Sequence, residues 1–297
     1  MQAGPPYNGT MLNQQELDRV CVVLVRARNP NNIGAAARAM HDFGFAGLRV
    51  VNQFPVPFEA ARSAVDASAV LANAMVCSSI ADAVGDCTLV IGTTAVGERD
   101  LRHPLLPLPE AAAHVRAELR RGNGAGSGNS IGSGAGAGRV ALLFGSEKTG
   151  LSNQELSHCN WLLTVPMREQ EALRHPSMNL GQAVAVCLYE LVRDEPVRAA
   201  PDAGGGQVSR DEPNPLVETC AVATAPETAA GLERLTVLLS EVLEQTGYTR
   251  RHPANSDLAQ VRRLVRRMSV HAGDAPVWMG ILRQVLWKLG GIASRER

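Results

Sequence analysis

Between positions 20 and 194, short runs of β-branched and aliphatic residues alternate with stretches of helical spacing, and this alternation constrains the fold more than any other feature. It is typical of a parallel sheet with crossover helices. The expected strands are 20–25, 48–51, 75–77, 88–92, 139–144 and 161–165, and the expected helices are 32–43, 65–74, 110–121 and 178–192. The sequence therefore predicts one α/β domain over residues 20–194.

Other segments differ from this domain in composition. We expect residues 1–19 to form a flexible N-terminus, the glycine-rich stretch 122–138 to be a surface loop inserted in the domain, and 195–229 to be an interdomain linker. Beyond the linker, helical spacing predicts a small helical domain over 230–297. Its expected helices are 231–246, 255–270 and 275–289.

Composition excludes some classes of protein. The chain has 29 basic and 29 acidic side chains, so a nucleic-acid surface would have to come from local clusters. The six cysteines form no CxxC pair and no cluster with histidine, so we interpret them as reduced core residues and expect no metal. No apolar run approaches the roughly 20 residues that cross a bilayer, and no signal-peptide pattern opens the chain. We therefore expect a cytoplasmic protein without membrane contact.

The segment 145–152 lies between a strand and a helix and has the glycine spacing of a phosphate-binding loop. Leu151 stands where that motif needs a lysine, and Glu147 adds a negative charge, so binding of a nucleoside triphosphate is disfavoured. A second glycine pattern, inside the insert 122–138, precedes a strand instead of following one. That order argues against a dinucleotide site.

Residues 29–38 directly follow the first strand. Gly34 and the adjacent alanines allow close backbone approach, and a helix continuing from Asn32 would place Asn32 and Arg38 near the carboxyl edge of the sheet, where open α/β sheets bind ligands. Two interpretations stay open here. Either both side chains face a ligand, with Arg38 holding a phosphate, or Asn32 caps the helix and Arg38 is a solvated charge.

The segment 175–180 opens the last expected helix of the domain. Ser177 stands where serine commonly caps a helix. We expect Asn179 one turn inside the helix, beside free backbone N–H groups, where an amide can bind a ligand as readily as it can satisfy the chain.

Taken together and in this order, the three segments resemble the motifs of the SpoU/TrmH (SPOUT) RNA ribose 2′-O-methyltransferases. The motifs N-x-G-x-x-x-R, F-G-x-E-x-x-G-L and S-x-N-L stand here at 32–38, 144–151 and 177–180. The resemblance implies an α/β domain with a trefoil knot, a rare exception to unknotted topology. It also implies S-adenosylmethionine as methyl donor and a homodimer with sites near the subunit interface.

The resemblance also implies roles for individual residues. Asn32, Ser177 and Asn179 would position the target nucleotide and order the loop around the cofactor, and Arg38 would contact the target. Arg38 has the position of a general base in such families, but a guanidinium with a pKa above about 12 is a reluctant base, so we expect orientation and phosphate anchoring first. The cofactor would lie near Thr93, Thr94, Ala95, Gly145, Val165, Pro176, Ser177 and Met178.

The helical tail is similar to the C-terminal extension of the TrmJ branch of the family, which methylates the pyrimidine ribose at position 32 in the tRNA anticodon loop. Arginines on or just before one expected helix suit a surface that follows RNA phosphates. They are Arg250, Arg251, Arg262, Arg263, Arg266 and Arg267. The alternative is a solvated helix face. The segment 166–176 is longer than this branch leads us to expect, and the glycine-rich insert is peculiar to this chain.

Two other functions stay open. One is a knotted methyltransferase acting on ribosomal RNA or another tRNA position, because the three motifs do not encode the target. The other is an inactive RNA-binding member that keeps the knot as a scaffold. The joint presence of Asn32, Arg38, Glu147, Ser177 and Asn179 speaks against an inactive member. Nothing in the sequence separates cytidine from uridine as the target.

Overall fold

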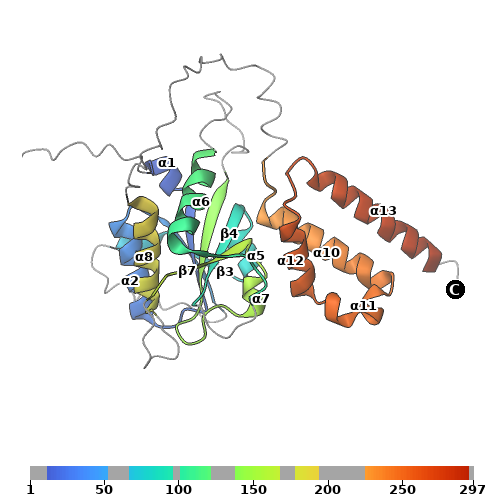
Figure 1. Ribbon diagram of the computed structural model, residues 1–297, viewed down its shortest axis with the longest axis horizontal. Coiled ribbons are helices and arrows are strands. Elements are labelled where there is room, and N and C mark those ends of the chain that lie inside the picture. The colour runs from blue at the N-terminus through green and yellow to red at the C-terminus, as the bar shows by residue number, and fades with distance from the viewer. Residues whose placement is uncertain are drawn as a thin grey trace, which may run out of the picture.

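The computed structural model describes residues 12–52, 67–95, 101–121, 138–167, 178–193 and 225–293. The strands are β1 (Val20–Val25), β2 (Gly47–Val51), β3 (Met75–Cys77), β4 (Cys87–Thr93), β5 (Leu105–Pro107), β6 (Arg139–Phe144) and β7 (Trp161–Thr164). They form one sheet of order β3-β2-β1-β6-β4-β7-β5, and every pair in it is parallel. The predicted parallel α/β domain is confirmed (Figure 1).

Helices cover both faces of this sheet, and each face has its own hydrophobic core. One core contains residues of α2 (Pro30–Asp42), α4 (Ser68–Ala72), α6 (Leu108–Arg121) and α8 (Leu180–Val192). The other contains residues of α5 (Ile80–Val84) and α7 (Asn153–Leu156). Side chains alternate along a strand, so Val22 and Leu24 of β1 enter the first core and Val23 enters the second. Burial on both faces explains why β1 is a continuous apolar run.

An ordered segment precedes β1, where we expected a flexible N-terminus. Leu12 is buried, and α1 (Gln14–Leu17) begins with a capping box. In this box the Glu16 amide donates to Asn13 Oδ1 at 3.0 Å and the Asn13 amide donates to Glu16 Oε2 at 2.8 Å. The N-terminal expectation is therefore wrong for residues 12–19. Residues 1–11, the insert up to 137 and the linker up to 224 lie outside the described residues.

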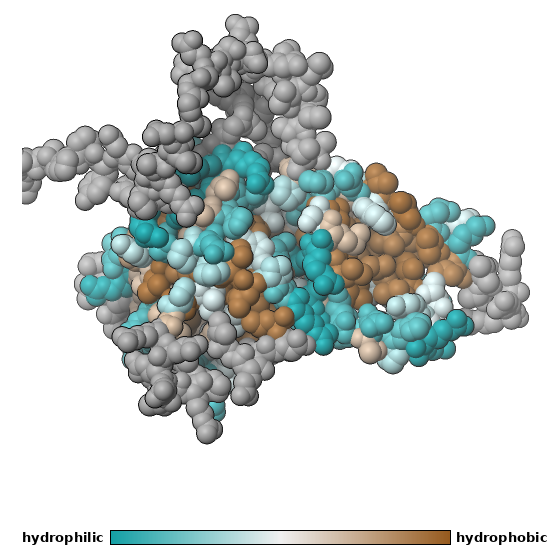
Figure 2. Space-filling model, viewed as in Figure 1, coloured by the Kyte–Doolittle hydropathy of each residue, from teal (hydrophilic) through white to brown (hydrophobic). Residues whose placement is uncertain are grey.

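The helical domain is confirmed, with shorter central pieces than predicted. It consists of α10 (Ala229–Gln245), α11 (Tyr248–Arg251), a 3-10 turn (Pro253–Asn255), α12 (Leu258–Arg267) and α13 (Ala275–Ala293). Leu232, Leu235 and Val265 lie in its core. Figure 2 shows a broad hydrophobic area over this domain. Among its exposed large hydrophobic residues are Ile281 and Val285 of α13.

The two domains are in direct contact. Ala229, at the start of α10, lies in the second core of the α/β domain, and the Ala230 amide donates to the Gly85 carbonyl at 3.0 Å. Five of the cysteines are buried and free, as predicted, and the sixth, Cys220, lies outside the described residues. Within the described ranges, no helix has both the length and the apolar character needed to span a bilayer.

Candidate functional site

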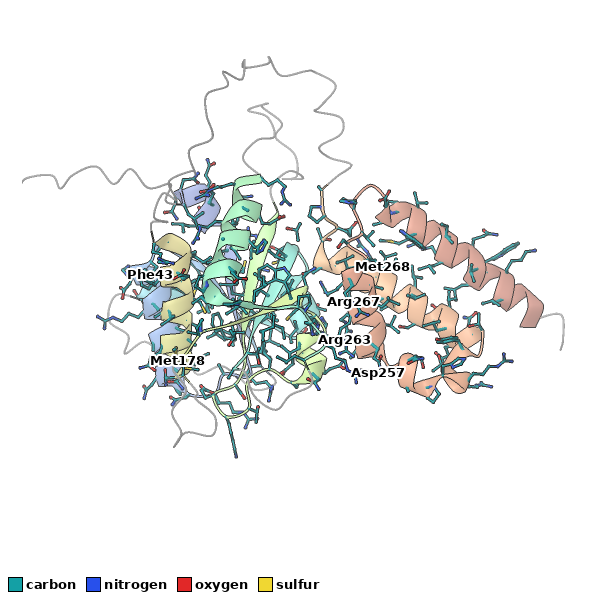
Figure 3. All side chains as sticks on the ribbon, in the orientation of Figure 1. Phe43, Met178, Asp257, Arg263, Arg267 and Met268 are labelled. Carbon is teal, nitrogen blue, oxygen red and sulfur yellow. The ribbon has the colours of Figure 1, made fainter. Side chains whose placement is uncertain are left out.

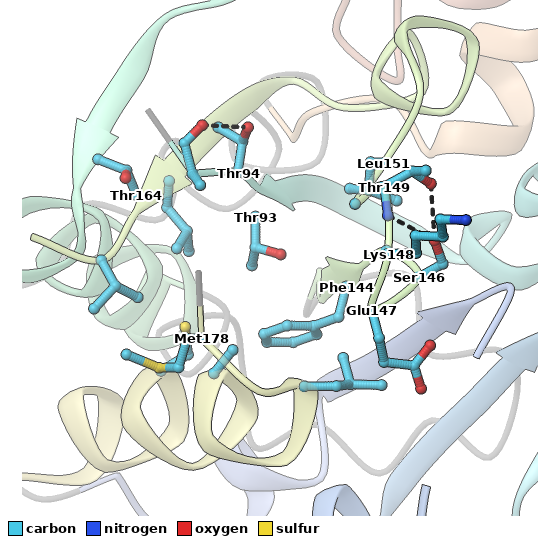
Figure 4. Close-up of a pocket in the computed structure, with 18 of the residues that line it drawn as sticks. Thr93, Thr94, Phe144, Ser146, Glu147, Lys148, Thr149, Leu151, Thr164 and Met178 are labelled. Carbon is cyan, nitrogen blue, oxygen red and sulfur yellow. Dashed lines mark hydrogen bonds between the residues drawn. The ribbon is translucent and has the colours of Figure 1, made fainter. Parts of the chain in front are cut away.

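A pocket of about 540 Å³ lies at the carboxyl edge of the sheet, where β4, β6 and β7 end (Figure 4). Parallel α/β sheets bind ligands at this edge, and the volume falls in the range of about 300–1,000 Å³ found for small-molecule sites. The cofactor residues that the resemblance implied and that the structure describes all line it. They are Thr93, Thr94, Ala95, Gly145, Val165 and Met178. Pro176 and Ser177 lie outside the described residues.

The loop that follows β6, residues 145–151, forms one wall of the pocket. A Cβ on Gly145 would stand 2.1 Å from the carbonyl carbon of Gly150, so only glycine fits there. Gly150 has a φ of +64°, which favours glycine as well. The Gly150 amide donates to the Ser146 carbonyl at 2.8 Å and closes the turn. The spacing that resembles a phosphate loop therefore serves a tight turn whose two glycines touch.

Asn32 joins the three motif segments. Its Nδ2 donates to Glu147 Oε1 at 3.0 Å, and its Oδ1 accepts from Asn179 Nδ2 at 2.9 Å. The alternative that Asn32 caps α2 is wrong, because Asn29 is the cap and accepts from the Asn31 amide at 3.0 Å. The Asn32 side chain, in the first turn of α2, is therefore free to contact residues outside this helix. Residues more than 100 positions apart in sequence thus meet beside the pocket.

Asn179 is the N-cap of α8, and we had expected it one turn inside the helix. Its Oδ1 accepts from the Gly181 amide at 2.9 Å while its Nδ2 donates to Asn32. One amide therefore both begins the helix and contacts the motif on α2. The two helices touch here, because a Cβ on Gly181 would lie 2.5 Å from the Ala35 Cβ.

Arg38 lies two turns along α2, about 9 Å beyond Asn32 at 1.5 Å per residue. It is exposed, forms no hydrogen bond or ion pair with any described residue and does not line the pocket. The structure thus brings Asn32 and Asn179 together and leaves Arg38 apart from them, on the outer side of the helix.

The interior of the pocket is mostly apolar. Phe144, Leu180 and Cys187 line it, and Figure 4 shows Phe144 and Met178 pointing into the space. Burial raises the pKa of the Cys187 thiol to about 12, so this group is neutral at physiological pH and is not a nucleophile. Thr93 Oγ1 donates to the Leu143 carbonyl at 2.9 Å. The pocket therefore suits a ligand with a large apolar part, held by polar groups at its rim.

Sequence reasoning missed several residues of the site. Phe144, Glu147 and Leu180 had a place in the motifs but no predicted contact with the cofactor, and Cys187 had been interpreted as a core residue. Thr164 could have been found, because it directly precedes Val165 at the end of a strand. No local sequence pattern could predict the contact between Asn32 and Glu147, because 115 positions separate the two residues.

The expected arginine surface on α12 is wrong for its central members. Arg262, Arg263 and Arg266 are only 4%, 9% and 5% exposed, because this face of α12 packs at the junction between the domains. Figure 3 places Arg263 and Arg267 at that junction. The exposed members of the predicted set are Arg250 and Arg251 on α11 and Arg267 at the end of α12.

Arg262 pairs with carboxylate and hydroxyl groups of the protein itself. Its Nε and Nη2 donate to the two carboxylate oxygens of Glu233 at 2.8 and 2.7 Å, and its Nη1 donates to Ser157 Oγ at 2.9 Å. This arginine therefore links α10 and α12 to the end of α7. The periodicity that predicted a phosphate-binding stripe instead reflects arginines buried at a domain contact, of which Arg262 is paired with Glu233 and Ser157.

Comparisons with known proteins identify the family of the chain. Residues 19–189 match the model of the SpoU rRNA Methylase family, which is more than half of the chain. The tRNA (cytidine/uridine-2'-O-)-methyltransferase TrmJ of Pectobacterium atrosepticum is 31% identical over 271 residues, 91% of this chain and 97% of that protein. The Escherichia coli K12 protein of the same name is 30% identical and covers 91% and 96%.

Solved structures show the same architecture. The structure of TrmJ from Z. mobilis ZM4 superposes with a TM-score of 0.64 at 26% identity, and the match covers 89% of this chain and 98% of that one. A probable methyltransferase from Bordetella pertussis Tohama I gives 0.51 at 30% identity and covers 60% and 97%. The family match includes all three motifs that meet at the pocket. This chain therefore belongs to the SpoU rRNA methylase family.

Proposed function

We propose that this protein is an S-adenosylmethionine-dependent tRNA ribose 2′-O-methyltransferase. The relatives that match nearly its whole length carry the name tRNA (cytidine/uridine-2'-O-)-methyltransferase. The observation that carries the proposal is the set of hydrogen bonds from Asn32 to Glu147 and Asn179 beside the pocket. An inactive scaffold would not need these amides and this carboxylate joined at the rim of a preserved cavity.

The pocket fits S-adenosylmethionine. Phe144, Leu163 and Leu180 offer apolar surface to the adenosine part, and the backbone of residues 93–95 and 145–150 offers hydrogen-bonding groups at the rim. Glu147, which lines the pocket, favours a cationic ligand over a triphosphate. When bound, the cofactor supplies a methyl group activated by its sulfonium.

Transfer to a ribose hydroxyl would be an in-line displacement, in which the ribose oxygen takes the methyl group, the sulfonium becomes a neutral thioether and the hydroxyl proton passes to solvent. The protein must therefore hold donor and acceptor in line. Asn32 and Asn179 fix the loop and the helix start that border the cofactor. Arg38, exposed and permanently charged, anchors a phosphate of the target nucleotide.

The active form is a homodimer with a trefoil-knotted α/β domain, and the protein acts in the cytoplasm. The aromatic ring of Tyr189 supports association through the outer face of α2 and α8: Tyr189 is 53% exposed, and its ring centroid lies 6.1 Å from that of the half-buried Phe43. Arg38 belongs to the same helix α2 and stands apart from its own pocket. A dimer through this face would bring Arg38 toward the pocket of the partner subunit.

The target is the ribose of pyrimidine 32 in the anticodon loop. Three exposed arginines, Arg250, Arg251 and Arg267, supply the positive charge that would follow the tRNA backbone outside the α/β domain. Arg262 joins the domains through Ser157 and Glu233, and its burial, like that of Arg263 and Arg266, leaves RNA contact to these three exposed arginines and to Arg38.

The proposal is tested by incubating the protein with methyl-labelled S-adenosylmethionine and with unmodified tRNA or ribosomal RNA. The expected result is label in tRNA, mapped to the 2′-oxygen of nucleotide 32 and absent from a transcript with 2′-deoxyribose there. Label only in ribosomal RNA, or at another tRNA position, would replace this target with the alternative one. Cofactor binding without transfer to either RNA would contradict the enzymatic proposal.

A further inference from the structure

Arg26, the residue that follows β1, has an unusual backbone conformation. Its φ is +58°, in the left-handed region that non-glycine residues rarely adopt. Such a residue persists only where its surroundings hold it, and such residues gather at functional sites. The three motifs do not include Arg26.

The Arg26 side chain reaches across to the loop and helix that follow β6. Its Nε donates to Glu155 Oε1 at 2.6 Å, and its Nη2 donates to Glu155 Oε2 at 2.9 Å. The same Nη2 donates to the Gly150 carbonyl at 3.0 Å. This bidentate pairing fixes the orientation of the guanidinium and not only its charge.

Glu155 is itself held from a second direction. Its Oε2 accepts from the Ser152 amide at 2.6 Å, and its own amide donates to Ser152 Oγ at 3.3 Å, which together form the capping box of α7. Its side chain is 14% exposed and that of Arg26 is 34% exposed, so solvent screens this pair less than a surface ion pair. Burial would raise the pKa of Glu155, but the hydrogen bonds from Arg26 and Ser152 lower it overall. The carboxylate is therefore charged at physiological pH.

The Gly150 carbonyl that Arg26 contacts belongs to the wall of the pocket. On one side, the loop is closed by the Gly145 and Gly150 contact and by the Ser146 turn. On the other side, Glu147 of the same loop contacts Asn32. Arg26 thus ties the far end of the loop to the end of β1, just before the motif on α2.

The same short helix also reaches the helical domain. Ser157, the C-cap of α7, accepts from Arg262 Nη1 at 2.9 Å. A displacement of α7 would therefore disturb both the domain contact at Ser157 and, through Glu155 and Arg26, the wall of the pocket.

We infer that Arg26, held by Glu155, is a positioning residue that fixes loop 145–151 in the shape that receives the cofactor. The inference rests on the proposed function, because it assigns the pocket to S-adenosylmethionine. Arg26 acts through the loop and touches no reacting atom.

The test compares Arg26→Ala with Arg26→Gly in the full-length protein. Both lose the guanidinium, but glycine adopts a φ of +58° without strain, so the glycine variant is the more stable of the two. Because charge-assisted hydrogen bonds are lost in both, we expect both to bind S-adenosylmethionine about tenfold more weakly, with KM for the cofactor raised and KM for tRNA unchanged. Arg121→Ala, which breaks the exposed ion pair with Glu118, is the matched control.

A purely structural role would give a different pattern. If Arg26 served stability alone, the more stable glycine variant would recover cofactor affinity, and that recovery would overturn the inference. Amide hydrogen exchange of Gly150 and Leu151 gives a readout that needs no methyl transfer. We expect this exchange to be faster in both Arg26 variants than in Arg121→Ala. Wild-type affinity for S-adenosylmethionine together with wild-type amide exchange in both Arg26 variants would overturn the inference. If amide exchange is faster in the variants but the wild-type protein transfers no methyl group to RNA, the inference stands and only the proposed function is contradicted.

Discussion

At the scale of single residues, the site depends on side chains that form hydrogen bonds with residues outside their own helix. Asn29 caps α2, so the amide of Asn32 can contact Glu147 and Asn179. Asn179 in turn divides its amide between the cap of α8 and Asn32. Each amide therefore uses both its donor and its acceptor. Because these hydrogen bonds form only when the three segments lie in one relative position, they favour a single arrangement of the site.

Arg38 differs from these amides, because it is exposed and forms no hydrogen bond or ion pair with a described residue. We expect Arg38→Ala to lower methyl transfer to tRNA by a factor on the order of 10², since a substrate anchor of this kind sets the alignment of the reacting atoms. Cofactor affinity, measured by calorimetry, should be largely unchanged. Near wild-type turnover would rule out the anchoring role, and Arg121→Ala controls for the loss of one surface charge.

At the scale of elements, α12 buries most of its arginine side chains instead of exposing them to solvent. Arg262 and Arg266 lie at the contact with α10 and with the α/β domain, and Glu233 neutralises part of their charge. Burial lowers the pKa of Arg266. Removing one partner of such a buried pair costs far more than an exposed pair contributes, so α12 is an element of domain association.

His158, next to the C-cap of α7, makes this contact sensitive to acid. Burial, followed by the charge of Arg262, lowers its pKa from 6.5 to about 4, although Glu233 and Glu155 act in the opposite direction and Arg266 reinforces the lowering. The unfolded state therefore binds more protons below pH 6.5. Stability should be fully present above pH 6.5 and fall as the pH drops from 6.5 toward 4.

Thermal unfolding at pH 7.5, 6 and 5 measures this dependence. The wild-type protein should lose stability over this interval, and His158→Gln should lose less, because the glutamine cannot take up the proton that favours unfolding. Parallel curves for the two proteins would show that His158 does not contribute to the pH dependence.

At the scale of the whole molecule, the sequence predicted the architecture well where burial is two-sided. β1 and β6 lie in the middle of the sheet, and their bounds match the predicted runs because all of their residues except Arg139 are buried on one face or the other and are apolar. Strand β5 was missed, since it has three residues, one of them Pro107, and lies at the sheet edge. The short α7 was missed for a similar reason, since four residues carry too little periodicity.

The site was predicted where it follows from motif order and missed where it depends on contacts across the chain. The described residues that were predicted to bind the cofactor, among them Thr93 and Met178, do line one pocket. The burial of Arg262 was not foreseeable, because its partners Glu233 and Ser157 are 29 and 105 positions away. Charge spacing on a helix is the same whether the charges face solvent or a partner domain.

In the proposed function, the three motif segments act as one methyltransferase site joined by Asn32. The most direct measurement is tRNA methyl transfer by Asn32→Ala beside Asn31→Ala, an exposed neighbour in the same turn of α2. Loss of the two exposed hydrogen bonds should leave the fold intact and lower the rate about a hundredfold, because the loop and the start of α8 lose their alignment. Asn31→Ala should keep the wild-type rate. Equal, near wild-type rates for both variants would contradict the account.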